Sequence, residues 1–333
     1  MTGLYPDIEP HDSGMLEVGD GNLVYWEACG NPAGKAAVVL HGGPGAGCTT
    51  RHRRLFDPER YRIVLLDQRG CGRSLPHAAD IATDLATNTT PHLVADLEAL
   101  RSHLGVDRWL VHGASWGSTL ALAYAQAHPA CVTEIVLAAV TMTRPGEIAW
   151  LYHGAGRFFP EAWERFRAGA GDLAGDGDLV TAYHRLLADP DPTVRVAAAE
   201  DWCAWEDAVL GEPAPARPHP PWDDPRFRMA FARLVTHYFH HRAWLDDGQL
   251  LRHAGRLSAI PGRLVHGRLD ISAPLVTAWE LARAWPGCEL TVLDAGHALT
   301  GPGMSETVVA ATDRFADPPP TAPNASNSSR PTP

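Results

Sequence analysis

Residues 113–117 place a serine in a pattern that nucleophilic catalysis uses. They read G-A-S-W-G, a G-x-S-x-G pentapeptide with Ser115 at its centre. An apolar stretch ending at His112 precedes it, and a helical pattern from Ser118 follows it. This is the context of a nucleophile elbow, a tight strand-to-helix turn that exposes the serine hydroxyl. The competing interpretation is a glycine-rich turn with an incidental serine, and the flanking elements favour the elbow.

A serine needs a base to accept its proton and an acid to orient that base. The C-terminal third of the chain supplies both, in the order Ser, Asp, His. Asp270 follows an apolar stretch at 263–266, and His297 follows another at 289–293 after a short loop containing glycine. We expect both side chains on loops at the same sheet edge as Ser115. Any one of the 17 histidines is by itself more often structural, and the position of this loop singles out His297.

Acyl transfer by a serine also needs backbone N–H groups aimed at the developing oxyanion. Trp116, the residue after the nucleophile, supplies one. The sequence HGGPG at 41–45 follows the apolar stretch 36–40 and resembles the loop that supplies the second donor, which we assign to Gly43. A phosphate-binding loop is the alternative, but the spacings G-x-G-x-x-G and G-x-x-x-x-G-K-S/T do not occur here.

Three histidines, His237, His240 and His241, have the helical spacing of metal ligands. They lack the H-E-x-x-H pattern, and a packed or solvated helix face explains them better. The sequence therefore implies neither a metal nor an organic cofactor.

The elements that must position these residues alternate along the chain. Short apolar stretches rich in β-branched residues predict buried strands at 36–40, 61–66, 108–112, 134–140, 263–266 and 289–293. Helical patterns lie between them at 92–104, 118–127 and 274–285. This alternation predicts an α/β fold, the α/β-hydrolase fold, with a mostly parallel central sheet and helices on both faces.

One region interrupts the alternation. Between residues 141 and 245 no strand is apparent, and helical patterns are broken by Gly and Pro. We therefore expect the core in two parts, 1–140 and 246–316, with a helical cap at 141–245 inserted between them. Residues 317–333, rich in Pro, Ser and Asn, are expected to form a disordered tail.

Composition narrows the function further. The 333 residues are 45% hydrophobic and carry a formal net charge of −11, so nucleic acid is not an expected partner. Apolar runs are too short to span a membrane, and the first residues do not resemble an export signal. The six cysteines are scattered without a C-x-x-C pair, which favours reduced thiols. We expect a cytoplasmic protein.

The longer motifs resemble one family. HGGPGAG at 41, DQRGCGRS at 67, GASWGSTLALAYAQAHP at 113 and HGRLD at 266 are similar to the proline iminopeptidases, serine peptidases of the α/β-hydrolase fold. So are LYPDIEPHDSGML near the start, FDPERY at 56, RFFPEAWERF at 157 and ATDRFA near the end. The similarity extends to about residue 316, and motifs of this length are highly specific.

The resemblance implies a role for each candidate residue. Ser115 is the nucleophile, His297 the base and Asp270 its orienting acid, while Gly43 and Trp116 donate to the oxyanion. It further implies that glutamates of the cap bind the free amino terminus of the substrate. Glu206, beside Trp205, matches one of them, and a cationic amine suits a carboxylate in an apolar, Trp-lined cap.

Two positions depart from the family pattern. Val235 stands where a second amine-binding glutamate is expected, and Thr141 stands near the place of an aromatic residue that closes the prolyl pocket. We therefore expect both at the substrate site, in a wider and more apolar pocket. Such a pocket also fits an amidohydrolase that removes an aminoacyl group from a hydrophobic, carrier-bound polyketide or macrolactam intermediate.

The expected activity is serine-dependent hydrolysis of an amide, releasing an N-terminal aminoacyl residue from a peptide or small molecule with a free amino terminus. An esterase is a less favoured alternative because the same residues cleave esters. A non-catalytic ligand-binding protein is least favoured, because the triad is complete. The charge is also local: residues 172–224 hold 12 acidic residues and 3 arginines, which favours a cationic substrate end.

Overall fold

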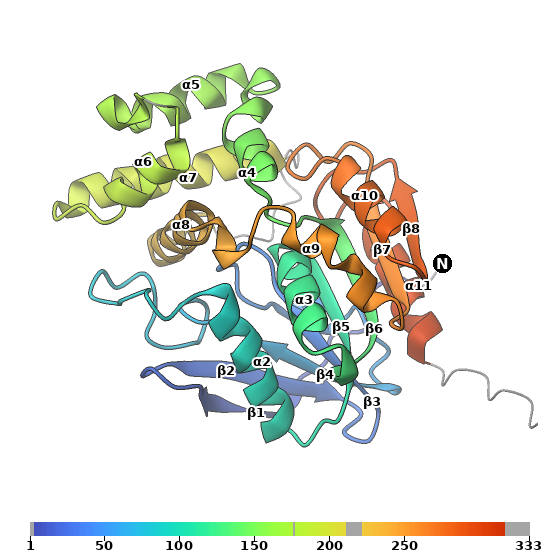
Figure 1. The fold of residues 1–333 in the computed structure, drawn as a ribbon. Helices are drawn as coiled ribbons and strands as arrows, with labels where there is room; N and C mark the ends of the chain where they lie inside the picture. The colour runs from blue at the N-terminus through green and yellow to red at the C-terminus, as the bar shows by residue number, and fades with distance from the viewer. Residues whose placement is uncertain (1–2, 176, 211–221, 317–333) are drawn as a thin grey trace, which may run out of the picture.

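The computed structural model describes residues 3–175, 177–210 and 222–316, and an eight-stranded sheet crosses their centre (Figure 1). The order of the strands is β1-β2-β4-β3-β5-β6-β7-β8. Their bounds are β1 Pro10–Glu17, β2 Leu23–Gly30, β3 Lys35–Leu40, β4 Tyr61–Leu66, β5 Trp109–Ser115, β6 Val132–Val140, β7 Gly262–Gly267 and β8 Cys288–Leu293.

Strands β3 to β8 pair in parallel, and they are the six strands that the apolar stretches predict. The sequence did not predict β1 and β2, which pair antiparallel with each other, β2 also pairing antiparallel with β4. The reason is visible in β1, whose sequence PHDSGMLE has no apolar run because most of its side chains remain exposed. An edge strand of this kind carries little of the hydrophobic pattern that marks a buried strand.

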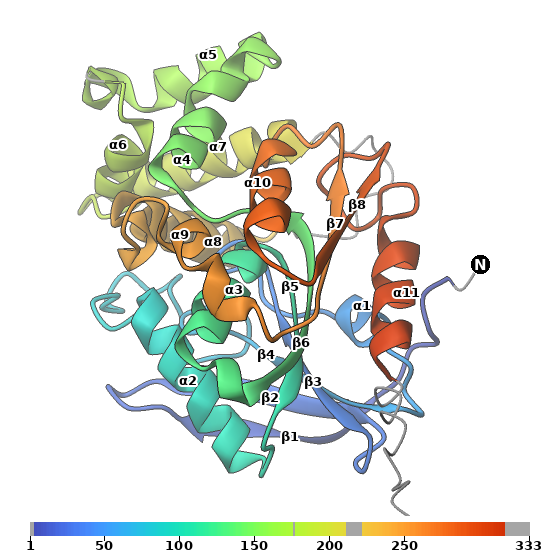
Figure 2. The same ribbon diagram turned by 45° about the vertical axis from the view of Figure 1, so that its right-hand side comes forward.

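Each central strand feeds two separate hydrophobic layers, as the two-residue period of a strand requires. In β3, Val38 and Leu40 pack with helices α2 (Thr90–His103), α3 (Trp116–Ala127) and α10 (Val276–Ala284). Their neighbours Ala37 and Val39 pack on the opposite face with Leu55 and Phe56, which follow α1 (Thr50–Arg53), and with α11 (Met304–Ala316). Figure 2 shows both layers, with α2, α3 and α10 on one side and α1 and α11 on the other. The α/β-hydrolase fold expected from the sequence is confirmed.

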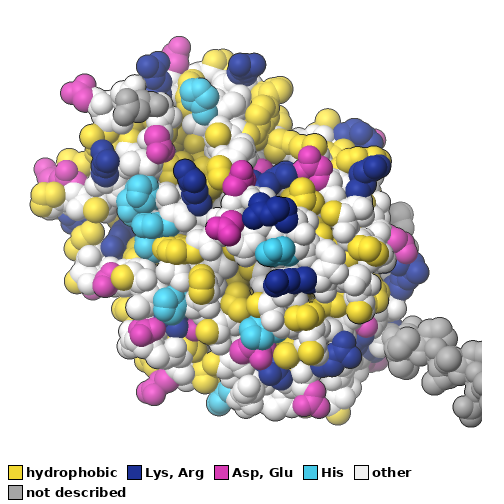
Figure 3. Space-filling model, in the orientation of Figure 1, with side chains coloured by type: hydrophobic (Ala, Val, Ile, Leu, Met, Phe, Trp, Pro, Cys, Tyr) yellow, Lys and Arg dark blue, Asp and Glu magenta, His cyan; other side chains and the backbone are white. Residues whose placement is uncertain are grey.

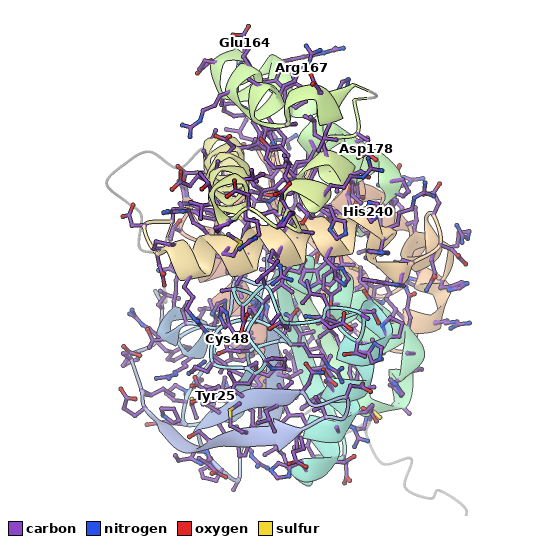
Figure 4. All side chains as sticks on the ribbon, turned by 90° about the vertical axis from the view of Figure 1, so that its left-hand side faces the viewer. Tyr25, Cys48, Glu164, Arg167, Asp178 and His240 are labelled. Carbon is purple, nitrogen blue, oxygen red and sulfur yellow. The ribbon has the colours of Figure 1, made fainter. Side chains whose placement is uncertain are left out.

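The chain between β6 and β7 contains no strand in its described part, 141–175, 177–210 and 222–261. Its α-helices are α4 Pro145–Tyr152, α5 Pro160–Gly169, α6 Leu179–Leu186, α7 Pro192–Leu210, α8 Pro225–His240 and α9 Gln249–Arg252. Short 3-10 helices stand between them at Gly154–Arg157, Gly171–Ala174 and Arg242–Trp244. Two more, Ala254–Leu257 and Pro129–Cys131, precede β7 and β6 respectively. Helices α4 to α7 lie above the end of the sheet, and α8 crosses between them and the core (Figures 1 and 4).

Helices α4 to α8 share a hydrophobic core of their own, built mainly from aromatic rings. Phe166 of α5 lies at its centre, stacked on Tyr183 with 4.6 Å between ring centroids and on Trp205 with 5.4 Å. Trp202 stacks in turn on Tyr152 at 4.6 Å. Large rings bury about 150–250 Å² each, so these contacts hold the helices together.

None of the helices in the described ranges has the length and apolarity needed to cross a lipid bilayer. The predicted tail, 317–333, and residues 211–221 of the region predicted as a cap lie outside the described residues.

Candidate active site

Ser115 ends β5 and stands directly before α3, at a sharp turn of the backbone. Its φ of 55° and ψ of −127° are unfavourable for a residue with a Cβ, and such strain is typical of catalytic turns. The two glycines of the pentapeptide explain how the turn fits. A Cβ on Gly117 would overlap the carbonyl of Leu40 in β3, and a Cβ on Gly113 would overlap the carbonyl of Gly117.

Asp270 and His297 meet at the same edge of the sheet, after β7 and β8 respectively. His297 Nδ1 lies 2.8 Å from Asp270 Oδ2, and the backbone N–H of Ala273 donates to Asp270 Oδ1 at 2.8 Å. The carboxylate is buried, so both oxygens need these partners. With Nδ1–H donating to Asp270, the Nε2 atom of His297 is left as the basic nitrogen.

His266, the first residue of the HGRLD motif, supports the loop that carries Asp270. The Val140 N–H donates to His266 Nδ1 at 3.0 Å, so the other ring nitrogen carries the proton and donates to the Ala273 carbonyl at 2.8 Å. Burial lowers the pKa of this imidazole, which keeps it in the neutral form that the two hydrogen bonds require.

The glycine loop after β3 runs beside the serine. A Cβ on Gly42 would sit 3.2 Å from the Ala114 carbonyl oxygen and 3.4 Å from Ser115 Cβ, so only glycine passes easily at this place. Gly43 has a φ of 112° and lines the same cavity as Ser115. Trp116 is the first residue of α3, where a backbone N–H has no partner within the helix and lies at the positive end of the helix dipole.

A cavity of about 200 Å³ opens over these groups. Its floor includes Ser115, His297, Gly43 and Trp116, and its wall comes from the helices above the sheet. The wall residues are Leu151, Tyr152, Glu206, Leu210, Trp222, Phe231 and Phe239, with Ala46, Thr141, Thr143, Ser272 and Ala273 at the junction with the core.

Glu206 is the acidic residue of this mostly apolar wall. The hydroxyl of Tyr152 donates a short hydrogen bond to Glu206 Oε1. Burial raises the pKa of the Glu206 carboxyl to about 7, although the Tyr152 hydrogen bond and the nearby His297 both act to lower it. A carboxyl of this kind is a strong attractor for a cation, because charge pairing is stronger where water is excluded.

Comparison with known proteins agrees with this geometry. Residues 36–300 match the model of the alpha/beta hydrolase fold family. A probable proline iminopeptidase of Streptomyces coelicolor is 54% identical over 318 residues, which cover 94% of this chain and 98% of the relative. The proline iminopeptidase of Xylella fastidiosa (strain Temecula1) is 48% identical, covering 95% of this chain and all of the relative.

The chain belongs to the proline iminopeptidase family. It is therefore an enzyme, an aminopeptidase of the α/β-hydrolase type. The crystal structure of a proline iminopeptidase from Mycobacterium smegmatis superposes with a TM-score of 0.62, covering 92% of this chain and 97% of that one. Their sequences are only 17% identical, so this likeness supports the fold alone.

The proline iminopeptidase fold brings together most of the residues singled out from the sequence. Ser115, His297, Gly43, Trp116, Glu206 and Thr141 all line the one cavity, and Asp270 stands behind His297. The Thr141 hydroxyl donates to Glu147 Oε2 at 3.0 Å, which fixes its side chain at the rim.

Two of the expected substrate contacts need correction. Trp205 is buried against Phe166, and its indole N–H donates to the Leu151 carbonyl at 3.2 Å, so it supports the wall from behind. Val235 is fully buried and is not on the cavity surface. Its side chain is shorter than the rings of Phe231 and Phe239, which flank it one helical turn away on each side and form the wall there.

Tyr152 is the main site residue that the sequence did not predict. It lies at the end of α4, outside the motifs that the sequence singled out, and its hydrogen bond to Glu206 and its place in the wall mark it. The sequence PGEIAWLY that ends at Tyr152 is a short, mostly apolar helix. No local pattern distinguishes its phenol from the other phenols of the aromatic core.

The histidines with metal-like spacing belong to a cluster of rings. His184 stacks on His240 with centroids 4.6 Å apart, and His237 and His241 lie 5.0 Å apart. Figure 3 shows histidine side chains gathered on the surface near α6 and α8, and Figure 4 places His240 beside Asp178. Across the described ranges, no three His, Cys, Asp or Glu side chains are arranged to hold a metal ion.

Proposed function

We propose that this enzyme releases the N-terminal residue of a peptide through an acyl-enzyme formed on Ser115. The observation that carries the proposal is one small cavity that joins Ser115 and His297 to a buried-carboxylate subsite at Glu206. A nucleophile and its base at one end, with a site for a cation at the other, match an amide whose acyl part carries a free amine.

In the first half of the reaction, Ser115 Oγ attacks the carbonyl carbon and His297 Nε2 accepts the hydroxyl proton. Asp270 keeps the imidazole oriented and stabilises its charge through the 2.8 Å contact with Nδ1. The backbone N–H groups of Gly43 and Trp116 stabilise the oxyanion. The tetrahedral species then expels the amine of the shortened peptide, which takes the proton from His297.

In the second half, water enters and gives a proton to His297 Nε2 while its oxygen attacks the ester carbon. Collapse of the second tetrahedral species breaks the bond to Ser115 Oγ, and the proton returns to the serine. The free amino acid leaves the cavity.

Glu206 binds the amino terminus in this proposal. Oε1 accepts the Tyr152 hydrogen bond, so Oε2 is available to the substrate ammonium. With Val235 in place of a second glutamate, one carboxylate and one phenol form this subsite. A charged partner fits well here because the Glu206 carboxyl is otherwise costly to ionise.

Proline is the residue that we propose is released. The names of the relatives refer to it, and a cavity of about 200 Å³ suits one compact ring better than a long side chain. The alternative substrate, an aminoacyl-capped polyketide intermediate, depended on a wider, more apolar pocket at Val235 and Thr141. Val235 lies behind the wall, and Thr141, which does line the cavity, presents a hydroxyl bonded to Glu147 and not an apolar surface. We therefore favour proline.

We interpret α4 to α8 as the cap predicted over 141–245, with the core in two parts around it. Its aromatic core is separate from the two layers on the sheet, and its α4, α7 and α8 supply the wall above Ser115.

The test is a set of four 4-nitroanilides, of proline, alanine, leucine and N-acetylproline, with the unmodified enzyme and Ser115→Ala. We expect cleavage of the prolyl compound to dominate, acetylation to abolish it, and Ser115→Ala to lose activity by about 10⁵-fold or more. Ser102→Ala, an exposed serine on α2, is the matched control. Equal cleavage of the acetylated compound would contradict the amine subsite, and an active Ser115→Ala would contradict the nucleophile.

A further inference from the structure

The sequence DQRGCGRS at 67–74 has no role in the chemistry described so far, yet it lies directly behind the oxyanion donors. It begins just after β4, and its second residue, Gln68, is buried at 2% exposure. The side chain of Gln68 touches the two chain segments that carry Gly43 and Trp116, which are far apart in the sequence.

Gln68 makes one hydrogen bond to each segment. Its amide nitrogen donates to the His41 carbonyl at 3.0 Å, and its amide oxygen accepts from the Trp116 indole N–H at 2.9 Å. The backbone N–H of Gln68 also donates to His41 Nε2 at 3.0 Å. The other imidazole nitrogen, Nδ1, therefore carries the proton and donates to the Gly42 carbonyl at 2.9 Å.

The chemistry of the partners requires an amide here. An indole N–H can only donate and a carbonyl can only accept, so the bridging side chain must offer one acceptor and one donor. Burial lowers the pKa of His41, which keeps its ring neutral as these bonds need. Every polar atom of the bridge has a partner, which is the condition for a rigid buried network.

The residue before Gln68 holds the far end of the same loop. Asp67 Oδ1 accepts from the Cys48 backbone N–H at 2.8 Å, while Asp67 Oδ2 accepts from Arg73 Nε at 2.7 Å. The loop 41–48 is thus fixed at both ends by consecutive residues. The Trp116 ring also packs edge-to-face against Tyr238, with centroids 4.8 Å apart.

We propose that Gln68 is a positioning residue that sets the distance between the two oxyanion donors. This inference rests on the proposed roles of Gly43 and Trp116. Two N–H groups stabilise an oxyanion only if both point at one place, and they come from separate segments whose spacing no local backbone rule fixes. The Gln68 amide joins those segments with two hydrogen bonds. One goes to the carbonyl of His41, directly before Gly42, and the other comes from the indole of Trp116.

Gln68→Met tests this directly, because it keeps the length of the side chain and removes both hydrogen bonds. We expect kcat for prolyl 4-nitroanilide to fall by about 10- to 100-fold with little change in KM, since misplacement affects the transition state more than the bound substrate. Inhibition by a prolyl boronic acid, whose tetrahedral adduct places an oxygen between the donors, should weaken by the same factor as kcat/KM. Inhibition by prolinol, which has the amine and no carbonyl, should not change.

Gln126→Met is the matched control. Gln126 is also buried and its amide donates to a carbonyl, that of Leu250 at 2.7 Å, but it lies at the far end of α3. We expect a comparable loss of thermal stability and an unchanged kcat.

Gln68→Glu gives a second measurement that a purely structural role would not move. When neutral, the new carboxyl can accept from the indole and donate to the His41 carbonyl; when ionised, it places a negative oxygen against that carbonyl. Its activity relative to the unmodified enzyme should therefore fall as the pH rises through its pKa, which burial raises.

The proposal is overturned if Gln68→Met keeps kcat within about threefold of the unmodified enzyme, or if prolinol and boronate lose affinity equally. It is also overturned if Gln126→Met loses kcat as much as Gln68→Met. If Gln68→Met does not fold, the pH profile of Gln68→Glu decides: a flat activity ratio contradicts the proposal. Ser115→Ala is measured in parallel, so that these outcomes are distinguished from failure of the proposed function. Activity retained in Ser115→Ala would contradict the role of Ser115 as nucleophile, whereas the Gln68 variants test only the positioning of the oxyanion donors.

Discussion

The catalytic edge of the sheet and the helices above it are built by different physical means. At the edge, backbone geometry does most of the work: a strained φ at Ser115, glycines that let strands approach, and hydrogen bonds of 2.8–3.0 Å that orient each polar group. In α4 to α8, packed aromatic rings hold the helices, and the polar element of the wall is a carboxylate with a phenol.

This difference separates reactivity from recognition. Reacting atoms must be held within a few tenths of an ångström, which directional hydrogen bonds achieve. Binding one residue with a free amine needs a cavity of the right size and charge, which packing provides with fewer constraints on each residue. Changes at the edge should therefore reduce kcat, and changes above it should alter stability, affinity or pH dependence.

The largest effect is expected at the edge. Asp270→Asn should lower kcat by about 10³- to 10⁴-fold with little change in KM, because the amide can no longer hold His297 with a proton on Nδ1. The measurement is steady-state kinetics on prolyl 4-nitroanilide. Asp294→Asn, at an exposed aspartate near the same edge, should have no such effect. Similar losses in the two variants would remove Asp270 from its role.

In the helices, the largest effect is on stability. Phe166→Ala should lower the free energy of unfolding by about 3–5 kcal/mol, because it leaves a cavity between Tyr183 and Trp205. Chemical denaturation measures it. Phe158→Ala, at a ring that is 59% exposed, should change stability by no more than about 0.5 kcal/mol. Unchanged kcat in the folded fraction of Phe166→Ala would support the separation of reactivity from the packing of the helices. A fall in that kcat would show that loosening the helices also disturbs the turn at Ser115, and would contradict the separation.

Glu206→Gln should act on recognition. We expect kcat/KM for a prolyl anilide to fall by about 100-fold, the size of a desolvated charge contact, and that for a neutral ester without an amine to change little. Glu200→Gln, on the exposed side of the same helix, is the control. An equal loss for both substrates would mean that Glu206 shapes the cavity and does not bind the amine.

The pH dependence of kcat/KM should reveal the titration of Glu206. A carboxyl whose pKa is raised to about 7 is mostly protonated below that pH, so it loses the charge that binds an ammonium group. The ratio of kcat/KM for the prolyl anilide to that for the neutral ester should therefore rise as the pH increases through about 7. Glu206→Gln should make this ratio flat, and a ratio that still rises in that variant would assign the titration elsewhere.

The smallest effect is expected at Tyr152. Its hydrogen bond lowers the pKa of Glu206, so Tyr152→Phe should move the rise of that ratio to higher pH and reduce kcat/KM near neutrality by only about three- to tenfold. Tyr183→Phe removes a buried phenol from the same aromatic core without touching the cavity. If both variants shift the pH profile equally, the effect is not transmitted through the Glu206 hydrogen bond.

Most of the core could be predicted because its rules are local. A G-x-S-x-G turn between a strand and a helix, and a glycine loop after a buried strand, each depend on a few neighbouring residues. The parallel strands were visible as apolar stretches because most of their side chains are buried on both faces, β8 at the edge of the sheet being the exception. β1 was not predicted because most of its side chains are exposed, so its sequence lacks an apolar pattern. Its pairing with β2 cannot be inferred from the sequence of either strand alone.

The cavity wall could not be predicted in the same way. Along α8, residues 230–232 and 234–238 are buried on nearly all sides, because the helix lies between the core and the other helices. Its buried side chains face both the core and the other helices, so its sequence does not show which of them meet the substrate. Phe231 and Phe239 do so and Val235 does not, which depends on the reach of each side chain in the packed structure.

The sequence by itself determined the catalytic residues to be tested, the parallel sheet that aligns them and the insertion that follows β6. These depend on short-range backbone geometry and hydrophobic periodicity, which a linear pattern records. Only the tertiary structure decided that Tyr152 meets Glu206, that Trp205 stands behind the wall, and that Gln68 joins the loops of both oxyanion donors. Those contacts link residues tens of positions apart, and which of them form is set by how whole elements pack against one another.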